Sequence, residues 1–373
     1  MDVLKLAKRL IELDTANPPG DQRGCADYIA DVLKPFSRVK VYDREGVRNV
    51  VAEVKFSRGG ETLVFNGHWD TVPWSSDAWS QHPLKPVVHD GWLYGRGAAD
   101  MKGGLAALLT AFEELSRHEG LEGKVVLMAV GDEETGGLKG TAYVLSKVKK
   151  PDYVLIGEST NLKLKVGRRG IILVRLKVYG DEMHSSRVYM DYTSSIEICS
   201  ELTLLLKRLD PGDEMDIMPR TTFAVTIFEA GVKENVLPRV TNMCIDVRNT
   251  PKVTRANVEE VIRRELEKLR GKYGRFRYEL DVREGATPYI VKDSRIIQVA
   301  EKVYKELGLV PSYDAGGGAS DGRFFFQKGI RNLVEIGPIG RNIHGVDEGV
   351  LVDSLYQSHK IYTMIGREIL SSR

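Results

Sequence analysis

The feature of this sequence that most constrains its fold is a set of short apolar runs. Each run is followed by a glycine and then by a histidine or an acid. LVF leads to His68, LMAV leads to Glu133 and Glu134, and VLI leads to Glu158. Apolar runs of this length between turn residues are typical of buried strands. In open α/β sheets, ligands bind in the crevice at the carboxyl ends of the strands. We therefore expect these polar side chains to converge on one edge of a sheet.

Segments with helical and strand periodicity alternate along the first part of the chain. The helical segments are residues 2–14, 22–35 and 103–115, and the strand segments are residues 38–55, 61–65, 124–130 and 152–156. This alternation predicts an α/β fold with a mixed, largely parallel sheet sandwiched by helices.

The pattern changes after residue 170. A β-α-β-β-α-β order follows, with strands that alternate apolar and polar residues, and it predicts a ferredoxin-like α+β unit with one open sheet face. The first pattern then resumes with a helix, a strand and a last helix, at residues 294–307, at 333–337 and from 352. We therefore predict a first domain made of residues 1–170 and 285–373, interrupted by an inserted domain at 171–284.

The composition argues against several classes of partner. The formal net charge is only +2 and the basic residues are scattered, which is not the pattern of a nucleic-acid-binding protein or of a polybasic membrane anchor. No apolar stretch approaches the ~20 residues that span a bilayer, and the amphipathic start MDVLKLAKRLIEL lacks the apolar core of a signal peptide. Cys25, Cys199 and Cys244 form no CxxC pair, so we expect reduced thiols and a cytoplasmic protein.

Two more residues complete a set of metal-ligand types. Asp100 precedes a predicted helix, and His344 follows a predicted strand. With His68, Glu158 and the Glu133–Glu134 pair, they supply the imidazoles and carboxylates of a two-metal hydrolase. A mixed histidine and carboxylate set suits Zn²⁺, Co²⁺ or Mn²⁺ better than Ca²⁺ or Mg²⁺. We expect two divalent ions, Zn²⁺ first, with Co²⁺ or Mn²⁺ as alternatives.

The chemistry of such a centre divides the residues by role. Two ions ~3.5–4 Å apart need a shared ligand, and Asp100, with two oxygens, is suited to bridge them. Adjacent Glu133 and Glu134 cannot easily both bind one ion, so one is expected to ligate while the other takes a proton from water as general base. Asp70 is expected to hydrogen-bond the free ring nitrogen of His68 and to fix its tautomer.

Nine motifs spread over nearly the whole chain resemble those of one family. They are GHWDTVP, GRGAADMKGG, GDEETGG, GES, GRRG, NVLP, DVR, GGGASDGRF and NIHGVDE. The family comprises dinuclear-metal amide hydrolases such as succinyl-diaminopimelate desuccinylase, acetylornithine deacetylase, aminoacylase and glutamate carboxypeptidase. The chain is most similar to the desuccinylase and acetylornithine deacetylase branch. The resemblance implies a zinc-peptidase-like catalytic domain, an inserted lid and dimerisation domain, and a homodimer formed through that domain.

The resemblance also assigns the metal ligands. It implies that His68 and Glu158 hold one ion, that Glu134 and His344 hold the other, and that Asp100 bridges them.

Further roles follow from the same resemblance. Glu133 is implied as the general base and Asp70 as the residue that orients its histidine, and the peptide bond between Asp100 and Met101 is expected to be cis. His184 in DEMHSS is implied to polarise the substrate carbonyl, whose oxyanion must be stabilised. The positions expected to line or support the substrate pocket are Arg169, Asn235, Arg248 and Arg323. Among these, Arg248 is the expected partner of a substrate carboxylate.

Two stretches depart from the desuccinylase pattern. His184 is followed by Ser-Ser-Arg-Val where those enzymes have x-x-Tyr-Pro, and Ala319 stands where they have threonine. A pocket that loses two hydroxyl donors should hold a succinyl group less selectively. Arg187 offers a replacement contact for an anion, so acidic acyl groups are not excluded.

The sequence therefore predicts a metal-dependent hydrolase of an N-acyl amino acid or short peptide. A metal-bridging water, deprotonated by Glu133, is expected to attack the amide of a substrate such as N-succinyl-diaminopimelate or N-acetylornithine. The alternative within the class is a broad-specificity metallocarboxypeptidase or aminoacylase. A non-catalytic relative is expected to lack a ligand or the base, and this chain keeps them all. A mononuclear aminopeptidase needs an HExxH helix, which is absent from the sequence.

Overall fold

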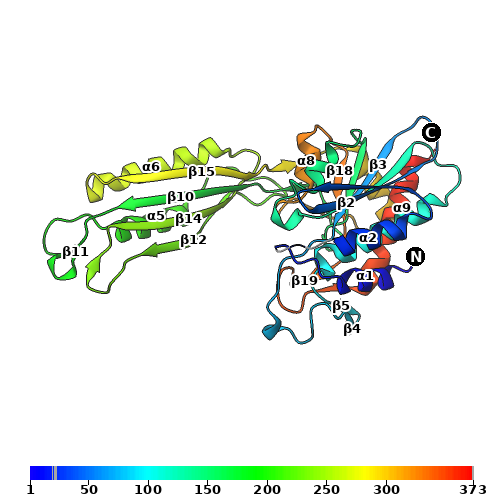
Figure 1. Ribbon diagram of the computed structural model, residues 1–373. Coiled ribbons are helices and arrows are strands. Elements are labelled where there is room, and N and C mark those ends of the chain that lie inside the picture. Colours follow the sequence, from blue (N-terminus) through cyan, green and yellow to red (C-terminus); the bar gives the residue numbers. More distant parts are fainter. Residues whose placement is uncertain (19, 21–22, 372–373) are drawn as a thin grey trace. The chain divides into compact units, whose positions relative to one another are not determined.

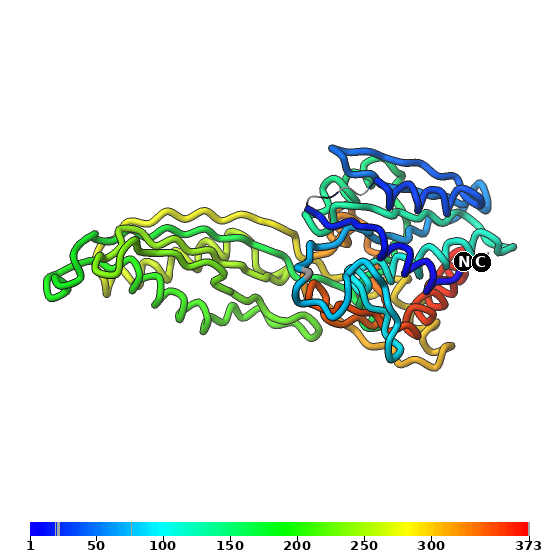
Figure 2. The backbone as a smooth tube through the Cα atoms, turned by 60° about the horizontal axis from the view of Figure 1, so that its bottom comes forward, coloured from blue at the N-terminus to red at the C-terminus, as the bar shows by residue number. Residues whose placement is uncertain are grey.

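The chain forms two compact units in a computed structural model that describes residues 1–18, 20 and 23–371. The first unit comprises Met1–Val166, Val291–Asp314 and Ser320–Arg373, and the second comprises Gly167–Ile290 and Ala315–Ala319. In Figure 2 the long part of the second unit is the stretch that runs from green to yellow. The short segment Ala315–Ala319, with the sequence AGGGA, groups with the second unit, which the sequence pattern did not anticipate.

The first unit is built on an eight-stranded sheet with the order β1-β2-β6-β3-β7-β18-β8-β17. Figure 1 labels β2, β3 and β18 of this sheet. The strands are β1 (Arg38–Arg44), β2 (Val47–Lys55), β3 (Thr62–His68), β6 (Lys124–Val130), β7 (Tyr153–Ile156), β8 (Leu164–Lys165), β17 (Tyr313–Asp314) and β18 (Leu333–Glu335). Its central pairs, β6–β3, β3–β7 and β7–β18, are parallel, whereas β1–β2 and β2–β6 are antiparallel. The predicted mixed, largely parallel sheet is confirmed.

Helices cover both faces of this sheet. They are α1 (Val3–Glu12), α2 (Arg23–Leu33), α3 (Gly103–Ser116), α4 (Thr141–Leu145), α7 (Arg295–Glu306), α8 (Gly322–Gln327) and α9 (Val352–Leu370). On one face, α3 packs against α1, α9 and β3 and is buried along nearly its whole length, because its sequence is apolar all round. On the other face, the short α4 is fixed by a hydrogen bond of 3.0 Å from Asn66 in β3 to Thr141.

A second, smaller sheet of the first unit was not predicted from the sequence. Its order is β19-β20-β5-β4, formed by β4 (Val87–His89), β5 (Trp92–Tyr94), β19 (Gly340–Arg341) and β20 (Gly349–Leu351). Strands of two or three residues carry too little alternation to be recognised in sequence. This sheet frames the loop that carries His344, because that loop joins β19 to β20.

The second unit has the β-α-β-β-α-β order that the sequence predicts. Its main elements are β10 (Ile171–Tyr179), α5 (Ser195–Arg208), β12 (Thr222–Ala230), β14 (Val240–Arg248), α6 (Arg255–Tyr273) and β15 (Tyr278–Ala286). The sheet order is β12-β14-β10-β15 and all three pairings are antiparallel. Alternate residues of β10 are buried with α5 and α6, while Leu173 between them is 47% exposed. The ferredoxin-like arrangement with one open face is confirmed.

Three short pairings complete the described secondary structure. β9 (Gly167–Arg168) pairs with β16 (Tyr289–Ile290) where the inserted chain begins and ends, and β11 (Met183–His184) pairs with β13 (Val236–Leu237). No helix among the described residues is both long enough and apolar enough to cross a bilayer.

Two backbone segments of the first unit touch where α3 begins. A Cβ atom on Gly104 would lie 1.8 Å from the carbonyl oxygen of Gly157, which immediately precedes Glu158. Only glycine permits this approach, because neither backbone can move aside without disturbing the helix or the sheet. The contact fixes the start of α3 against the end of β7.

We predict that Gly104→Ala lowers the free energy of unfolding by about 1–3 kcal/mol, the usual cost of forcing extra volume into a packed interior. Gly59→Ala is the matched control, because a Cβ there meets nothing within 4 Å, and it should change stability by less than about 0.5 kcal/mol. Urea denaturation followed by circular dichroism measures both. Equal midpoints for the two variants would contradict the contact.

Candidate metal centre

Neighbouring strands bring most of the candidate ligands to one edge of the main sheet. His68 is the last residue of β3, Glu133 and Glu134 begin the short helix η3 (Glu133–Thr135) after β6, and Glu158 lies two residues beyond β7. Since β6, β3 and β7 are adjacent and parallel, their carboxyl ends lie side by side. Asp100 lies in η2 (Ala98–Lys102), directly before α3.

The carboxylate of Asp100 lies between the two histidines. Its Oδ1 is 3.1 Å from Nε2 of His68, and its Oδ2 is 3.1 Å from Nε2 of His344. On the outer sides, Nε2 of His68 is 3.4 Å from Glu158, and Nε2 of His344 is 3.2 Å from both oxygens of Glu134. The donors therefore form two groups that share Asp100, which is the arrangement that two ions with a bridging carboxylate require.

The donor set fits divalent cations. Ligand atoms of His68, Asp100 and Glu134 all lie within 4.8 Å of one another. Five carboxylates, those of Asp70, Asp100, Glu133, Glu134 and Glu158, surround only two imidazoles in a largely buried site. Such an excess of negative charge is costly away from water unless cations balance it. Imidazole nitrogens and carboxylate oxygens together are the donors that zinc accepts.

The acid–base properties of the cluster reflect this crowding. Burial tends to raise the pKa of Asp100, but hydrogen bonds from His344 and His68 outweigh it and hold the pKa below the usual range. The hydrogen bonds to Asp100 and Glu134 raise the pKa of His344 to about 10. Burial raises the pKa of Glu134 to about 7, although the hydrogen bond from His344 opposes the shift.

Glu133 differs from its neighbour Glu134. Burial raises the pKa of Glu133 well above its usual value; nearby His68 opposes the shift, and the surrounding carboxylates add to it. Within the described part of the chain, its carboxylate has no hydrogen-bond or ion-pair partner, whereas Glu134 pairs with His344. Glu133 is therefore the carboxylate of the pair that is left free.

Asp70 connects two of the loops that carry these residues. It is fully buried, its carbonyl oxygen lies 2.9 Å from Nδ1 of His68, and its carboxylate lies 3.3 Å from the same nitrogen. The carboxylate also accepts the backbone N–H groups of Glu133 and Glu134, at 3.2 and 3.1 Å, and an amide proton of Asn17 at 3.0 Å. Asp70 thus orients the imidazole and also fixes the loop after β6.

Glu348 is a structural member of the site that sequence reasoning missed. Its buried carboxylate accepts backbone N–H groups from Gly97, Ala99 and Asp100, at 2.9–3.0 Å, and pairs with Arg96 at 2.6 Å. It therefore holds η2, in which the peptide bond between Asp100 and Met101 is cis, as the family resemblance implied. A carboxylate that binds backbone N–H groups has no characteristic spacing, and its place in NIHGVDE was the only available signal.

The candidate substrate residues of the second unit already have partners. His184 is exposed, and its Nε2 lies 3.3 Å from the side-chain amide of Asn235. Arg248 makes two hydrogen bonds to Asp246, at 2.7 and 3.0 Å. Arg169 donates to the hydroxyl of Thr222 at 3.2 Å. A substrate carboxylate would therefore have to compete with Asp246 for Arg248.

Arg323 lies in the first unit, against the loop that carries the two glutamates. Its guanidinium donates to the carbonyl oxygen of Gly136 at 2.6 Å and to that of Ser320 at 3.3 Å, and the residue is only 7% exposed. Gly136 directly follows η3. Arg323 consequently braces the loop of Glu133 and Glu134, which corresponds to a supporting role.

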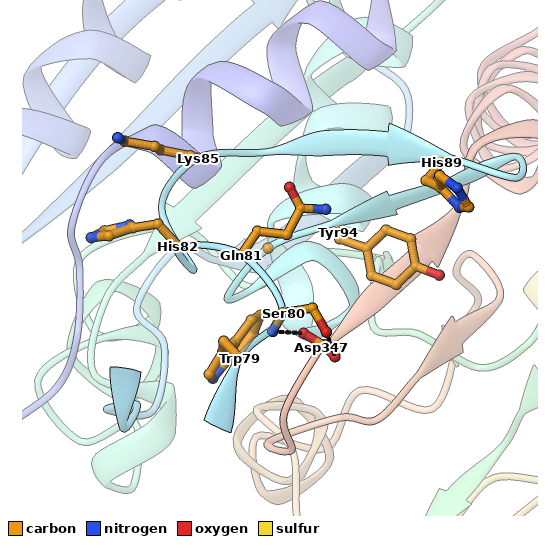
Figure 3. Close-up of a pocket in the computed structure, with 9 residues that line it drawn as sticks. Trp79, Ser80, Gln81, His82, Lys85, His89, Tyr94 and Asp347 are labelled. Carbon is orange, nitrogen blue, oxygen red and sulfur yellow. Dashed lines mark hydrogen bonds between the residues drawn. The ribbon is translucent and has the colours of Figure 1, made fainter. Parts of the chain in front are cut away.

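A cavity of about 220 Å³ opens beside the loop of His344 (Figure 3). Ser80 lines it and donates two hydrogen bonds to Asp347, from its backbone N–H at 2.9 Å and from its hydroxyl at 2.8 Å. The guanidinium of Arg96 lies 5.1 Å from the ring of Trp79, another lining residue. The segment around Ser80 is thus fastened to the loop that presents His344 and Glu348.

An α/β unit with a buried histidine and carboxylate centre at its strand ends defines a metal-dependent hydrolase. Residues 64–367 match the model of peptidase family M20/M25/M40, and the chain belongs to this family. It is 31% identical to the succinyl-diaminopimelate desuccinylase of Marinobacter nauticus, over 99% of this chain and 98% of that protein. It is 32% identical to the enzyme of the same name from an Azoarcus species, over 99% of this chain and 98% of that protein.

Solved structures share the fold of this chain. Aminopeptidase PepT of Bacillus cereus superposes with a TM-score of 0.81 at 19% identity, covering 98% of each chain. The YXEP protein of Bacillus subtilis, described as a dinuclear metal binding peptidase from family M20, superposes with a TM-score of 0.75 at 17% identity, covering 99% of this chain and 97% of that one.

We predict that Glu348→Gln weakens metal binding by about 10–100-fold, the usual effect of removing a residue that positions a ligand. An amide offers one acceptor oxygen, so either the N–H of Gly97 or those of both Ala99 and Asp100 lose their acceptor. Glu306→Gln, on an exposed side chain of α7, is the control. Competition with a chromophoric chelator measures the affinity, and unchanged affinity in Glu348→Gln would refute the positioning role.

Proposed function

We propose that this chain hydrolyses the amide bond of N-acyl amino acids, with N-succinyl or N-acetyl substrates first and short peptides as the alternative. One observation carries the proposal. Asp100 offers one oxygen to each histidine, while the neighbouring Glu133 keeps an unpaired carboxylate. The full-length likeness to proteins named succinyl-diaminopimelate desuccinylase supports the substrate class.

The proposed centre holds two divalent ions, Zn²⁺ first and Co²⁺ or Mn²⁺ as alternatives. His68 and Glu158 would hold one, Glu134 and His344 the other, and Asp100 both. When bound, such ions polarise the amide carbonyl and make a water molecule more acidic. Asp70 keeps the imidazole of His68 in the orientation in which Nε2 faces the centre, because Nδ1 is directed at Asp70.

Glu133 is proposed to move the proton. Its carboxylate accepts a proton from the attacking water and then delivers it to the nitrogen of the leaving amine, which could not otherwise depart. Glu134 is less suited to this task, because His344 occupies both of its oxygens.

His184 is proposed to stabilise the oxyanion. The backbone N–H of Ser186 points to Nδ1 at 3.1 Å, so a neutral ring carries its proton on Nε2 and presents a donor there. Asn235 fits this form if its amide oxygen faces Nε2 and accepts this proton until an oxyanion replaces it. This orientation would also satisfy Oδ1 of Asn235, which is otherwise buried without a partner. Arg187, Arg248 and Arg169 are proposed as the cationic contacts for acidic groups of the substrate.

We further propose a homodimer formed through the second unit, in the cytoplasm. β12 is an edge strand on which Ile227 and Phe228 are 46% and 41% exposed, and unpaired edge strands with apolar side chains are suited to pairing between chains. The three cysteines are free thiols, two of them buried, which suits a reducing compartment.

We predict that Glu133→Gln lowers kcat by about 10²–10⁴-fold, the usual contribution of a general base, while both metal equivalents stay bound. Glu134→Gln is the matched variant, because it changes the adjacent glutamate in the same way but should lose metal. Steady-state kinetics and elemental analysis of the dialysed proteins separate the two. Near-normal turnover in Glu133→Gln would remove it as the base.

A panel of N-succinyl, N-acetyl and dipeptide substrates, assayed on chelated enzyme reconstituted with Zn²⁺, Co²⁺ or Mn²⁺, tests the function itself. We expect turnover only with metal and the highest kcat/KM on an N-acyl amino acid. Ala319→Thr should raise the preference for succinyl over acetyl substrates, because it restores a hydroxyl donor. Full activity in the chelated protein, or cleavage of dipeptides alone, would overturn the proposal.

A further inference from the structure

One face of the main sheet is left partly uncovered at the edge formed by β1, β2, β6 and β3. Cross-strand pairing places Arg38 opposite Glu53 and Lys40 opposite Val51 on this face. Glu53 in turn lies opposite Val126 of β6. The reverse face is packed against α2 and α3, as Figure 1 shows for α2 and β2.

The open face arises because α4 is short. This helix ends at Leu145, and the chain then continues through Lys147, Val148 and Lys149 along the margin of the sheet. A cavity of about 340 Å³ remains between this segment and the four strands. A second cavity of about 250 Å³ adjoins it and shares Glu53, Thr62, Lys124 and Lys149. We call the two together the basic groove.

Positive charge dominates the basic groove. The described residues that line it include seven cations and one acid: Arg38, Lys40, Lys55, Arg58, Lys124, Lys147, Lys149 and Glu53. The whole chain has a formal net charge of only +2. Basic residues that are scattered along the sequence are therefore gathered here by the pairing of β1, β2 and β6 and by the segments that follow β2 and α4.

Most of these cations are not neutralised within the protein. Lys124 pairs with Glu53 at 2.9 Å, and Lys147 lies 5.2 Å from the ring of Tyr143. Among the described residues, no carboxylate lies within 4.0 Å of Arg38, Lys40 or Lys149, nor of Lys55 or Arg58. Like charges gathered around a concave surface repel one another and create a positive potential, which attracts anions into the cavity.

We propose that the basic groove binds a small molecule with at least two phosphate groups, of the class of nucleoside diphosphates. Several ammonium and guanidinium groups that converge on one cavity match a ligand with several anionic oxygens. The larger cavity, of about 340 Å³, is of the size of small-ligand sites, and the second cavity extends it. Nucleic acids, in contrast, are bound along extended basic surfaces, and these cations converge. The binding site is separate from the chemistry of the metal centre and does not depend on it.

The test is calorimetric titration of the metal-loaded enzyme with ADP in excess Mg²⁺, which keeps the nucleotide from extracting metal. Lys40→Glu/Lys149→Glu reverses one charge that lines the larger cavity and one that lines both cavities. Lys5→Glu/Lys328→Glu reverses two exposed lysines on α1 and just after α8, with the same change in net charge. We expect one ADP per chain with wild type and control, and binding weaker by on the order of tenfold or more in the groove variant. Added salt should weaken binding to wild type.

Three results would overturn the proposal. The first is no binding of ADP at millimolar concentration. The second is equal binding by the groove and control variants, which would place the nucleotide outside the basic groove. The third is displacement of ADP by an RNA oligonucleotide that binds more tightly, which would assign the groove to nucleic acid. Pyrophosphate and AMP as further ligands show whether two linked phosphates are required.

Discussion

The carboxylate of Asp100, placed between the imidazoles of His68 and His344, is the contact on which the arrangement of the site depends. Each oxygen lies 3.1 Å from one Nε2 atom. His68 ends a central strand, whereas His344 lies in a loop of the small second sheet. A single carboxylate therefore joins two separately built parts of the first unit, and any displacement of η2 would separate the two halves of the centre.

Buried carboxylates that bind backbone N–H groups keep this arrangement rigid. Asp70 fixes the start of η3, and Glu348 fixes η2. Burial raises the pKa of Glu348, and the hydrogen bonds from the backbone N–H groups of Asp100 and Gly97 oppose the shift. Glu348 also reaches Arg96, whose guanidinium lies over Trp79, so the support of the centre extends into the wall of the neighbouring cavity. The glycines at the start of α3 and at the end of β7 close the same region by direct backbone contact.

Much of the fold was predictable, because the local pattern of apolar and polar residues indicates where the helices and strands lie. The run KVVLMAV became β6 without a change of boundary, and the alternating strands after residue 170 became the sheet of the second unit. The small sheet β19-β20-β5-β4 was missed, since strands of two or three residues have no measurable period. In the site, the expected ligands come together around Asp100. The pairing of Arg248 with Asp246 and the contact of Arg323 with the loop after η3 could not be predicted from the sequence, because both depend on which groups become neighbours in the fold.

By itself, the sequence determined which residue types can serve in the site and which strands they follow. The periodicity of apolar residues and the positions of glycines are local properties, so both can be read from the sequence. It thereby determined the family and the class of chemistry. Only the tertiary structure decided which carboxylate stays free beside the histidines, which one supports the backbone of η2, and where scattered lysines gather into a basic groove. Those outcomes depend on distances between segments far apart in the chain, and such distances are set by packing and strand register.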